Sequence, residues 1–173
     1  MKLKIKIKEI VPGCMPEINP IGDWIDLKAS KDMEIRAAQA GTQYQENNYK
    51  FRDVFIHTTY IPLGVAMKLP KGFEAIIASR SSTPRKKGLF IPNGQGIVDI
   101  SYQGNDDEWH FIASPMNNTN IKKGDRVCQF RIQLSQKATF WQKLKWLFSS
   151  GIELVKVDNL NNNNRGGMDT TGD

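Results

Sequence analysis

The sequence contains few of the residues that build disulfide frameworks and zinc sites. It has two cysteines, Cys14 and Cys128, and two histidines, His57 and His110, in none of the close spacings that bind zinc. No Cys-His or Ser-His arrangement indicates a covalent nucleophile. We therefore expect the protein in a reducing compartment. Any catalysis must come from carboxylates, hydroxyls, arginines or a hard metal ion.

Long apolar runs are absent as well. No stretch reaches the roughly 18 apolar residues that are needed to cross a bilayer. The opening residues MKLKIKIKEI alternate lysine with leucine or isoleucine instead of forming the apolar core of a signal peptide. They predict a first β-strand in a cytoplasmic protein that does not associate with membranes.

The remaining composition is that of one ordinary globular domain. The chain has 173 residues, 39% of them hydrophobic and 24% charged, which fits a single folded unit of about 100 to 200 residues. Its net charge of +6 attracts anions without distinguishing polymers from small phosphates. Short apolar runs, broken about every ten residues by Gly, Pro or Asn, indicate an all-β fold. The expected strands lie within 2–11, 24–29, 33–38, 53–69, 72–79, 96–102, 108–114 and 126–134.

Two segments depart from this pattern. The polar stretch AGTQYQENNYKF, residues 40–51, predicts an exposed loop within a hairpin. The stretch TFWQKLKWLF, residues 139–148, predicts a short helix because its apolar residues recur at helical spacing. We expect that apolar face to pack on its own domain or on a neighbouring subunit. Trp146 falls off the face and is the residue left to touch something else.

Two stretches offer groups suited to phosphate and water chemistry. In SRSSTPRKKG, Arg80, Ser81 and Ser82 supply charged and neutral hydrogen-bond donors for phosphate oxygens. In NGQGIVDISYQG, Asp99 and Tyr102 reach one pocket only if a turn re-aims them, since an extended strand would point them to opposite faces. Each stretch alone is equally typical of an ordinary loop or turn.

Three further stretches complete an ordered set. DWIDLKA contains Asp26, GDRVCQF contains Arg126 and Gln129, and the C-terminal RGGMDTTG offers a guanidinium with hydroxyl and backbone donors. The order along the chain is DWIDLKA, SRSS, NGQGIVDISYQG, GDRVCQF and RGGMDTTG. These five stretches resemble the five motifs of the homotrimeric dUTP diphosphatases (dUTPases), most closely the phage and prophage branch. The resemblance covers nearly the whole chain, with 40–51 and 139–148 as insertions.

The resemblance implies a jelly-roll-like β domain over 1–160 and a flexible C-terminal arm over 161–173. Three such chains would build three shared active sites in the host cytosol, each closed by the arm of one chain over a site made by the other two. The implied reaction is hydrolysis of dUTP to dUMP and pyrophosphate with Mg²⁺. Asp99 matches the general base that activates water. Tyr102 matches the ring that packs on deoxyribose, and Asn93 and Gly96 match the hairpin that reads uracil.

The phosphate side of the site follows from the same resemblance. Arg80, Ser81 and Gln129 match phosphate contacts, with Ser82 beside them, and Asp26 matches a carboxylate that holds the metal through water. In the arm, the implied substrate contacts are Arg165, Met168, Thr170 and Thr171. An activated water and charge-neutralising arginines with Mg²⁺ suffice for such a hydrolysis, so no covalent nucleophile is required.

Three positions differ from the family pattern. Trp24 stands where the first motif usually has glycine, Met168 replaces the aromatic residue of the arm, and Asp169 replaces its glycine. Met168 still offers a flexible apolar cover for the base. Asp169 adds a negative charge beside a triphosphate and lacks the freedom of glycine, so we expect weaker closure over the γ-phosphate.

Two other functions fit parts of the sequence. A dCTP deaminase would share the fold and the Arg-Ser-Ser-x-x-Arg pattern through Arg85. It needs a glutamate on the following strand, where this chain has Ile112 or Ala113 and only an earlier Glu108. A regulatory protein would use the same trimer, with 139–148 as its contact for a protein partner. Nucleic-acid binding is not expected, because the lysines are scattered without interleaved aromatic residues.

Overall fold

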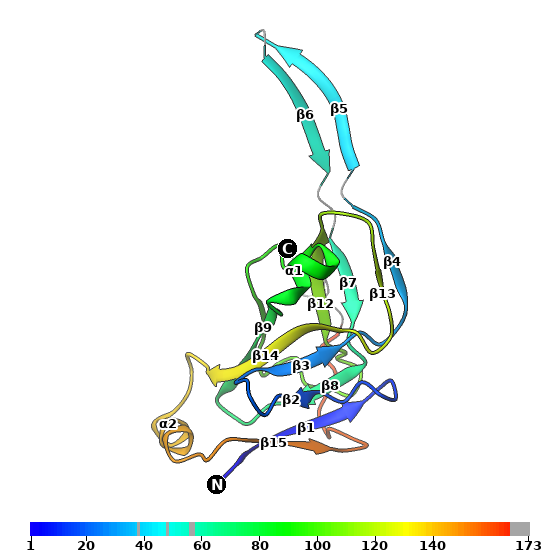
Figure 1. Cartoon of the computed structure of the whole chain (residues 1–173). Coiled ribbons are helices and arrows are strands. Elements are labelled where there is room, and N and C mark those ends of the chain that lie inside the picture. The colour runs from blue at the N-terminus through cyan, green and yellow to red at the C-terminus, as the bar shows by residue number, and fades with distance from the viewer. Residues whose placement is uncertain (38, 48, 56–57, 167–173) are drawn as a thin grey trace.

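The computed structural model describes residues 1–37, 39–47, 49–55 and 58–166, with the backbone alone at 39–44 and 51–55. It confirms the all-β fold, with two short helices (Figure 1). The elements are β1 Leu3–Glu9, β2 Glu17–Ile18, β3 Ile25–Lys28, β4 Met33–Ile35, β5 Gln39–Glu46, β6 Tyr49–Phe55, β7 Thr59–Pro62, β8 Val65–Lys68, β9 Phe73–Ser79, α1 Ser82–Lys87, β10 Leu89–Phe90, β11 Gly96–Val98, β12 His110–Pro115, β13 Thr119–Ile121, β14 Arg126–Leu134, α2 Phe140–Leu147 and β15 Ile152–Lys156. Neither described helix is long and apolar enough to cross a membrane.

β1 forms as its alternating sequence predicts. Leu3, Ile5 and Ile7 are buried, while the lysines between them are exposed. β1 lies between β15, to which it is parallel, and β8, to which it is antiparallel. One face of this sheet therefore packs on the core, and β1 exposes lysines on the other face.

A second sheet carries most of the predicted motifs. Its strand order is β11-β9-β14-β3-β2, and all its pairings are antiparallel. Because β3, β9, β11 and β14 are hydrogen-bonded neighbours, motifs that lie far apart in sequence are placed along a single surface. The three-stranded sheet β10-β12-β7 lies beside it in the upper part of the body (Figure 1).

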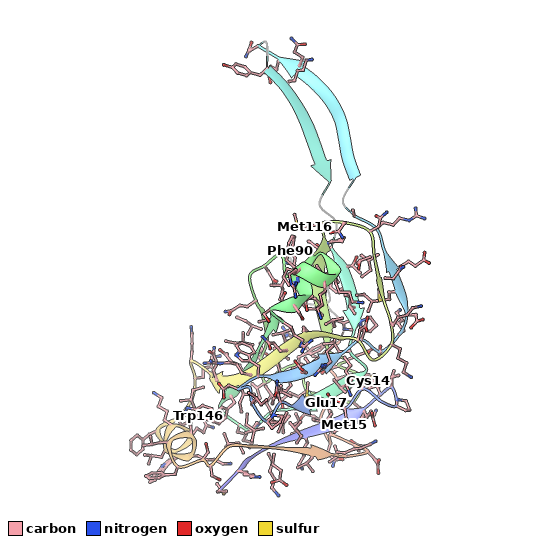
Figure 2. All side chains as sticks on the ribbon, in the orientation of Figure 1. Cys14, Met15, Glu17, Phe90, Met116 and Trp146 are labelled. Atoms are coloured by element: carbon pink, nitrogen blue, oxygen red, sulfur yellow. The ribbon has the colours of Figure 1, made fainter. Side chains whose placement is uncertain are left out.

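The core lies between these sheets and is almost entirely apolar. Its largest fully buried side chains include Trp109, Phe73, Phe111 and Phe130, and the Trp109 ring meets Phe130 edge to face at 5.3 Å between centroids. Both cysteines belong to this core as free thiols, and Cys14 lies within the body (Figure 2). Burial raises the pKa of the Cys14 and Cys128 thiols, so neither is an activated nucleophile.

The hairpin expected around residues 40–51 is present, but most of the stretch predicted as its loop is paired strand. β5 and β6 pair from Gln39 opposite Phe55 to Glu46 opposite Tyr49, and the hairpin extends away from the body (Figure 1). Asn47, at φ 49°, begins the turn between the two strands. The polar composition suggested a loop because it lacks hydrophobic alternation, but strand pairing uses backbone groups and needs no apolar face.

The sequence also did not predict α1, which starts within the Ser-rich motif. Thr83 fixes the helix to the sheet by donating its hydroxyl to the Val127 carbonyl, at 2.8 Å. Gly88 ends it in the left-handed conformation, at φ 62°. At six residues, the helix is too short for a hydrophobic period to reveal it.

α2 forms where predicted, but this chain alone does not cover its expected packing face. Thr139 and Gln142 make a capping box at its start. The expected packing face is mostly solvent-exposed, with Phe140, Trp141 and Leu147 between 66% and 76% exposed. Trp146 instead faces the body and packs its ring on Phe73, with centroids 5.3 Å apart (Figure 2).

This orientation predicts different effects for the two tryptophans of α2. Trp146→Ala should lower the free energy of unfolding by about 1 to 2 kcal/mol, because it removes a partly buried aromatic contact. Trp141→Ala is the matched control and should leave the value within about 0.5 kcal/mol. Urea unfolding at one fixed protein concentration measures both. Equal losses for the two variants would contradict the observed orientation.

Candidate active site

One half of the site is a buried carboxylate held by two arginines. Asp26 lies in β3 and is only 4% exposed. Its Oδ1 accepts a hydrogen bond from Arg80 Nε at 2.8 Å, and its Oδ2 accepts one from Arg126 Nη1 at 3.2 Å. A buried carboxylate needs such compensation. In return, Asp26 fixes both guanidinium groups at the end of the sheet.

Next to this ion-pair cluster lies a basic pocket. Four cationic side chains and one carboxylate contribute to its wall, whose residues are Arg80, Ser82, Thr83, Lys86, Lys87, Gly124, Asp125 and Arg126. Lys87 is paired with Asp125 at 2.7 Å, and Arg80 and Arg126 share Asp26, so the four cations still outnumber the two carboxylates. The pocket therefore suits a phosphate group.

Ser81 and Gln129, predicted with Arg80, lie beside this pocket and do not line it. Ser81 is exposed and precedes α1, where its hydroxyl caps no backbone N–H of the helix. Gln129 pairs with Asp26 across β14 and β3, and its side-chain amide donates to the Ser79 carbonyl at 3.3 Å. We call this region, with Asp26, Arg80 and Arg126, the phosphate half-site.

The second half of the site is a pocket with mixed polar and apolar walls. It brings together Asn93, Gly96 and Tyr102, which the sequence placed in one substrate-binding hairpin. The other lining residues are Ile77, Ile91, Ile97, Val98, Glu108, Trp109, His110 and Ile112. We call this the base half-site, because one flat apolar group edged by polar atoms would fit such walls.

Tyr102 is held rigidly in this pocket. Its hydroxyl donates to the Glu108 carbonyl at 2.9 Å. Burial first, and then the charges of Asp107 and Glu108, raise the pKa of the phenol. Tyr102 is therefore a neutral ring in a fixed orientation that forms part of the pocket wall.

Trp109, His110 and Ile112 were not predicted as part of this pocket. They come from β12, whose sequence EWHFIAS indicated a strand but no binding motif. His110 Nδ1 lies 2.9 Å from the Glu108 carbonyl. Within the described residues, the buried indole N–H of Trp109 has no hydrogen-bond partner. Only the pairing of β12 with β7 and β10 places these residues, and a single sequence does not reveal that pairing.

Asp99 lies just outside the base half-site, in the turn that the motif required. β11 ends at Val98, and the Tyr102 N–H then donates to the Asp99 carbonyl at 3.2 Å. Asp99 therefore lines a neighbouring depression, with Glu74, Ser101, Ser135 and others. Its side chain is exposed to solvent in the isolated chain.

The environment of Asp99 favours the ionised carboxylate. Ser101 donates both its hydroxyl and, at 2.7 Å, its backbone N–H to Asp99 Oδ1. The hydroxyl bond is the largest cause that lowers the pKa of Asp99, and the charges of Arg165 and Lys137 act in the same direction, against partial burial. Asp99 is thus a carboxylate that is ready to accept a proton at neutral pH.

Asp99 lies far from the phosphate half-site of its own chain. Val98 of β11 pairs with Ala75 of β9, so Asp99 is level with Glu74, whereas Arg80 follows the opposite end of β9. The six positions between residues 74 and 80, at about 3.3 Å each, separate Asp99 from Arg80 by about 20 Å. A single chain therefore does not bring its carboxylate to its own basic pocket.

The described part of the C-terminal segment lies beside the base half-site. The Arg165 N–H contacts both carboxylate oxygens of Asp107 at 3.1 Å. The Arg165 charge influences Asp99 and Tyr102 of the same chain. The other predicted arm contacts, Met168, Thr170 and Thr171, lie outside the described residues, as does Asp169.

Comparison with known proteins agrees with these features. The family model described as dUTPase matches residues 44–144. The SPbeta prophage-derived deoxyuridine 5'-triphosphate nucleotidohydrolase YosS of Bacillus subtilis is 38% identical over 172 residues, which cover 98% of this chain and 99% of that protein. This chain belongs to the dUTPase family. The deoxyuridine 5'-triphosphate nucleotidohydrolase of Finegoldia magna is 30% identical over 81% of this chain and 85% of its own.

Solved dUTPase structures share the fold. The dUTPase of Streptococcus mutans superposes with a TM-score of 0.58 at 22% identity, covering 73% of this chain and 90% of its own. The dUTPase of staphylococcal bacteriophage 80α gives 0.58 at 16% identity, covering 79% and 93%. The family resemblance read from five short motifs is confirmed.

One departure from the dUTPase motif pattern has a local explanation. Trp24, at the position where the family usually has glycine, lies under the guanidinium of Arg131, whose Cζ is 5.6 Å from the ring centroid. This cation–π contact gives the larger side chain a place on the surface of the five-stranded sheet. It lies one residue from β3 and so does not alter the pairing that carries Asp26.

The Ser101 hydrogen bond predicts a shift in the pH dependence of this dUTPase. Ser101→Ala removes the largest cause that lowers the pKa of Asp99, so that pKa should rise. The acid limb of kcat/KM should then move to higher pH. Ser135→Ala is the control, because Ser135 lines the same depression without bonding to Asp99. A pH–rate profile unchanged in Ser101→Ala would show that Asp99 does not set the acid limb.

Proposed function

We propose that the chain hydrolyses dUTP to dUMP and pyrophosphate at sites shared between the chains of a homotrimer. The observation that carries this proposal is the register that places Asp99 level with one end of β9 and Arg80 after the other, about 20 Å away at the usual rise of a strand. A general base and a phosphate-binding arginine must both lie within hydrogen-bonding distance of one small substrate. The base half-site of one chain therefore works with the phosphate half-site of another.

The reaction assigned to Asp99 is activation of water. The carboxylate accepts a proton from a water molecule while the water oxygen bonds to the α-phosphorus. The bond from that phosphorus to the bridging oxygen breaks, and pyrophosphate leaves with the bonding electrons. Because the Ser101 hydroxyl lowers its pKa, the Asp99 carboxylate is ionised when the water arrives.

The base half-site determines which nucleotide the chain accepts. Asn93 and the backbone at Gly96 face uracil, and a Cβ added at Gly96 would lie 3.3 Å from Ile77, so the hairpin fits closely against β9. Tyr102 packs on deoxyribose and leaves no room for a 2′-hydroxyl. Glu108 also lines this pocket, but its carboxylate accepts from the Gly64 N–H at 2.8 Å. It is therefore not a free proton shuttle of the kind a cytosine deaminase needs.

The phosphate half-site supplies charge compensation. Arg80 and the hydroxyl of Ser82 face the phosphates, with Ser81 and Gln129 adjacent to them. These donors stabilise the negative charge that develops on the phosphate oxygens as pyrophosphate leaves. Arg126 keeps Asp26 neutralised, which frees Arg80 to donate its remaining N–H groups to substrate.

Mg²⁺ fits this site only as an ion held mainly by the substrate. Within the described residues no group of three or more His, Cys, Asp or Glu side chains could hold a metal. Asp26 already accepts an arginine on each oxygen, yet its remaining lone pairs can receive metal-bound water. When bound, Mg²⁺ would neutralise phosphate charge.

A protein partner at α2 remains a second role for the same trimer. The observation that favours it is the exposed apolar face of α2, formed by Phe140, Trp141, Leu147 and Phe148. Exposed aromatic residues of this number on one short helix are unusual on a free surface. This role is compatible with dUTP hydrolysis, because α2 lines neither half-site.

The reaction is tested by incubating the protein with each dNTP and Mg²⁺ while following pyrophosphate and ammonia. Pyrophosphate should form from dUTP only. Asp99→Asn should lower kcat by about 100-fold or more, because the variant cannot accept the proton. Ammonia from dCTP, or full activity in Asp99→Asn, would contradict the assignment.

Site sharing is tested by mixing two inactive chains. Asp99→Asn and Arg80→Ala chains carry different affinity tags, are co-expressed, and trimers that hold both tags are purified. In a closed ring of three, one of the three sites then combines intact Asp99 with intact Arg80, so about one third of the wild-type rate should return. Mixed trimers as inactive as their parents would show that each chain builds its own site.

A further inference from the structure

The depression that contains Asp99 also contains a lysine that belongs to none of the five motifs. Lys137 lines this depression together with Asp99 and Glu74. It follows β14, several residues after the end of the GDRVCQF stretch. Its side chain is solvent-exposed in the isolated chain, like that of Asp99. A cation therefore shares the depression with the carboxylate that is proposed to activate water.

Lys137 lies in a turn whose two ends are both fixed. The Ala138 N–H donates to the Ser135 carbonyl at 3.0 Å, which closes the turn. The Ser135 N–H donates to the Gly72 carbonyl at 2.9 Å, and Ala138 is only 8% exposed. The backbone of Lys137 therefore has a defined position at the edge of the depression.

The helix α2, which follows the end of β14 (Figure 1), secures the other side of this turn. Thr139 caps the helix, and the side chain of Gln142 completes the capping box. Gln142 lies directly on Gly72, because a Cβ added at Gly72 would meet the Gln142 side-chain amide. Gly72 thus contacts both the start of the turn and the first turn of α2. The helix that the sequence indicated as an insertion therefore helps to fix the turn that carries Lys137.

Three other segments bring charged groups to Asp99. The Ser101 hydroxyl is the largest cause that lowers the pKa of Asp99, and the charges of Arg165 and Lys137 act in the same direction. Glu74, on the adjacent β9, is the other carboxylate of the depression, and it accepts a hydrogen bond from a glutamine amide of β14 at 2.6 Å. Among the described residues that line the depression, Lys137 is the only cation.

We propose that Lys137 is a positioning residue that acts through Asp99, as a positive charge that stabilises the carboxylate until it takes a proton from water. The inference rests on the function proposed above, which makes Asp99 the general base. A bound triphosphate brings several negative charges, and these disfavour a further anion in the site. Lys137 offsets this effect at the one carboxylate that has to remain ionised.

Lys137→Ala should narrow the pH range of activity from the acid side. Loss of the positive charge raises the pKa of Asp99, so kcat/KM on the acid limb should fall about twofold to threefold, an effect that solvent screening limits. Above this limb, where Asp99 is ionised in either protein, kcat/KM should stay at the wild-type value. Lys137→Arg keeps the charge and should restore the profile. Lys143→Ala is the matched control, because this exposed lysine of α2 lies outside the depression.

Two kinetic results would overturn the inference. A pH–rate profile of Lys137→Ala that coincides with the profile of Lys143→Ala would show that the Lys137 charge does not act on Asp99. A loss of kcat/KM by the same factor at every pH, together with a raised KM, would show that Lys137 binds the nucleotide instead of acting through Asp99.

The Asp99 carboxyl group can also be titrated without substrate. NMR of nucleotide-free protein with isotope-labelled aspartate carboxyl carbons follows this group, whose signal is identified by its loss in Asp99→Asn. The midpoint of the titration should lie at higher pH in Lys137→Ala, and it should be unchanged in Lys137→Arg and Lys143→Ala. Equal midpoints in the wild type and Lys137→Ala would overturn the inference and leave the proposed function intact. Full activity in Asp99→Asn would instead overturn the proposed function.

Discussion

The antiparallel register of β9 is the constraint on which the rest of the site depends. β9 is hydrogen-bonded to β11 on one side and β14 on the other, so one strand fixes the position of three motifs. Asp99 is level with one end of β9 and Arg80 follows the other, so the register sets the distance between these two residues. Strand geometry, more than any single contact, fixes where each motif lies on this sheet.

The Asp26 cluster shows how the same sheet prepares its phosphate end. Asp26 is buried because β3 is an inner strand, and a buried carboxylate requires two cationic partners for full compensation. The partners come from the end of β9 and the start of β14, which the register brings to the same place. The arginines are therefore oriented before any nucleotide binds, which limits the reorganisation that binding requires.

The sequence predicted those parts of the molecule whose signals are local. Alternation predicted β1, spacing predicted the helix α2, and five motifs predicted the family and some of the residues that line the two pockets. It could not predict which side of α2 faces the body, because periodicity identifies an apolar face without showing what lies opposite it. The same limit applies to Trp109 and His110, which enter the base half-site through strand pairing alone. The strands of the hairpin β5–β6 were taken for its loop because polar strands show no hydrophobic alternation.

The Asn-rich tail makes contacts that its composition does not reveal. A run of asparagines is typical of a solvated linker, yet Asn159 and Asn164 each bond to a defined partner in the loop 104–107. Their side chains carry both donors and acceptors, so they substitute for backbone pairing where no strand continues. The consequence is electrostatic: attachment keeps the Arg165 charge close enough to help lower the pKa of Asp99 before substrate arrives.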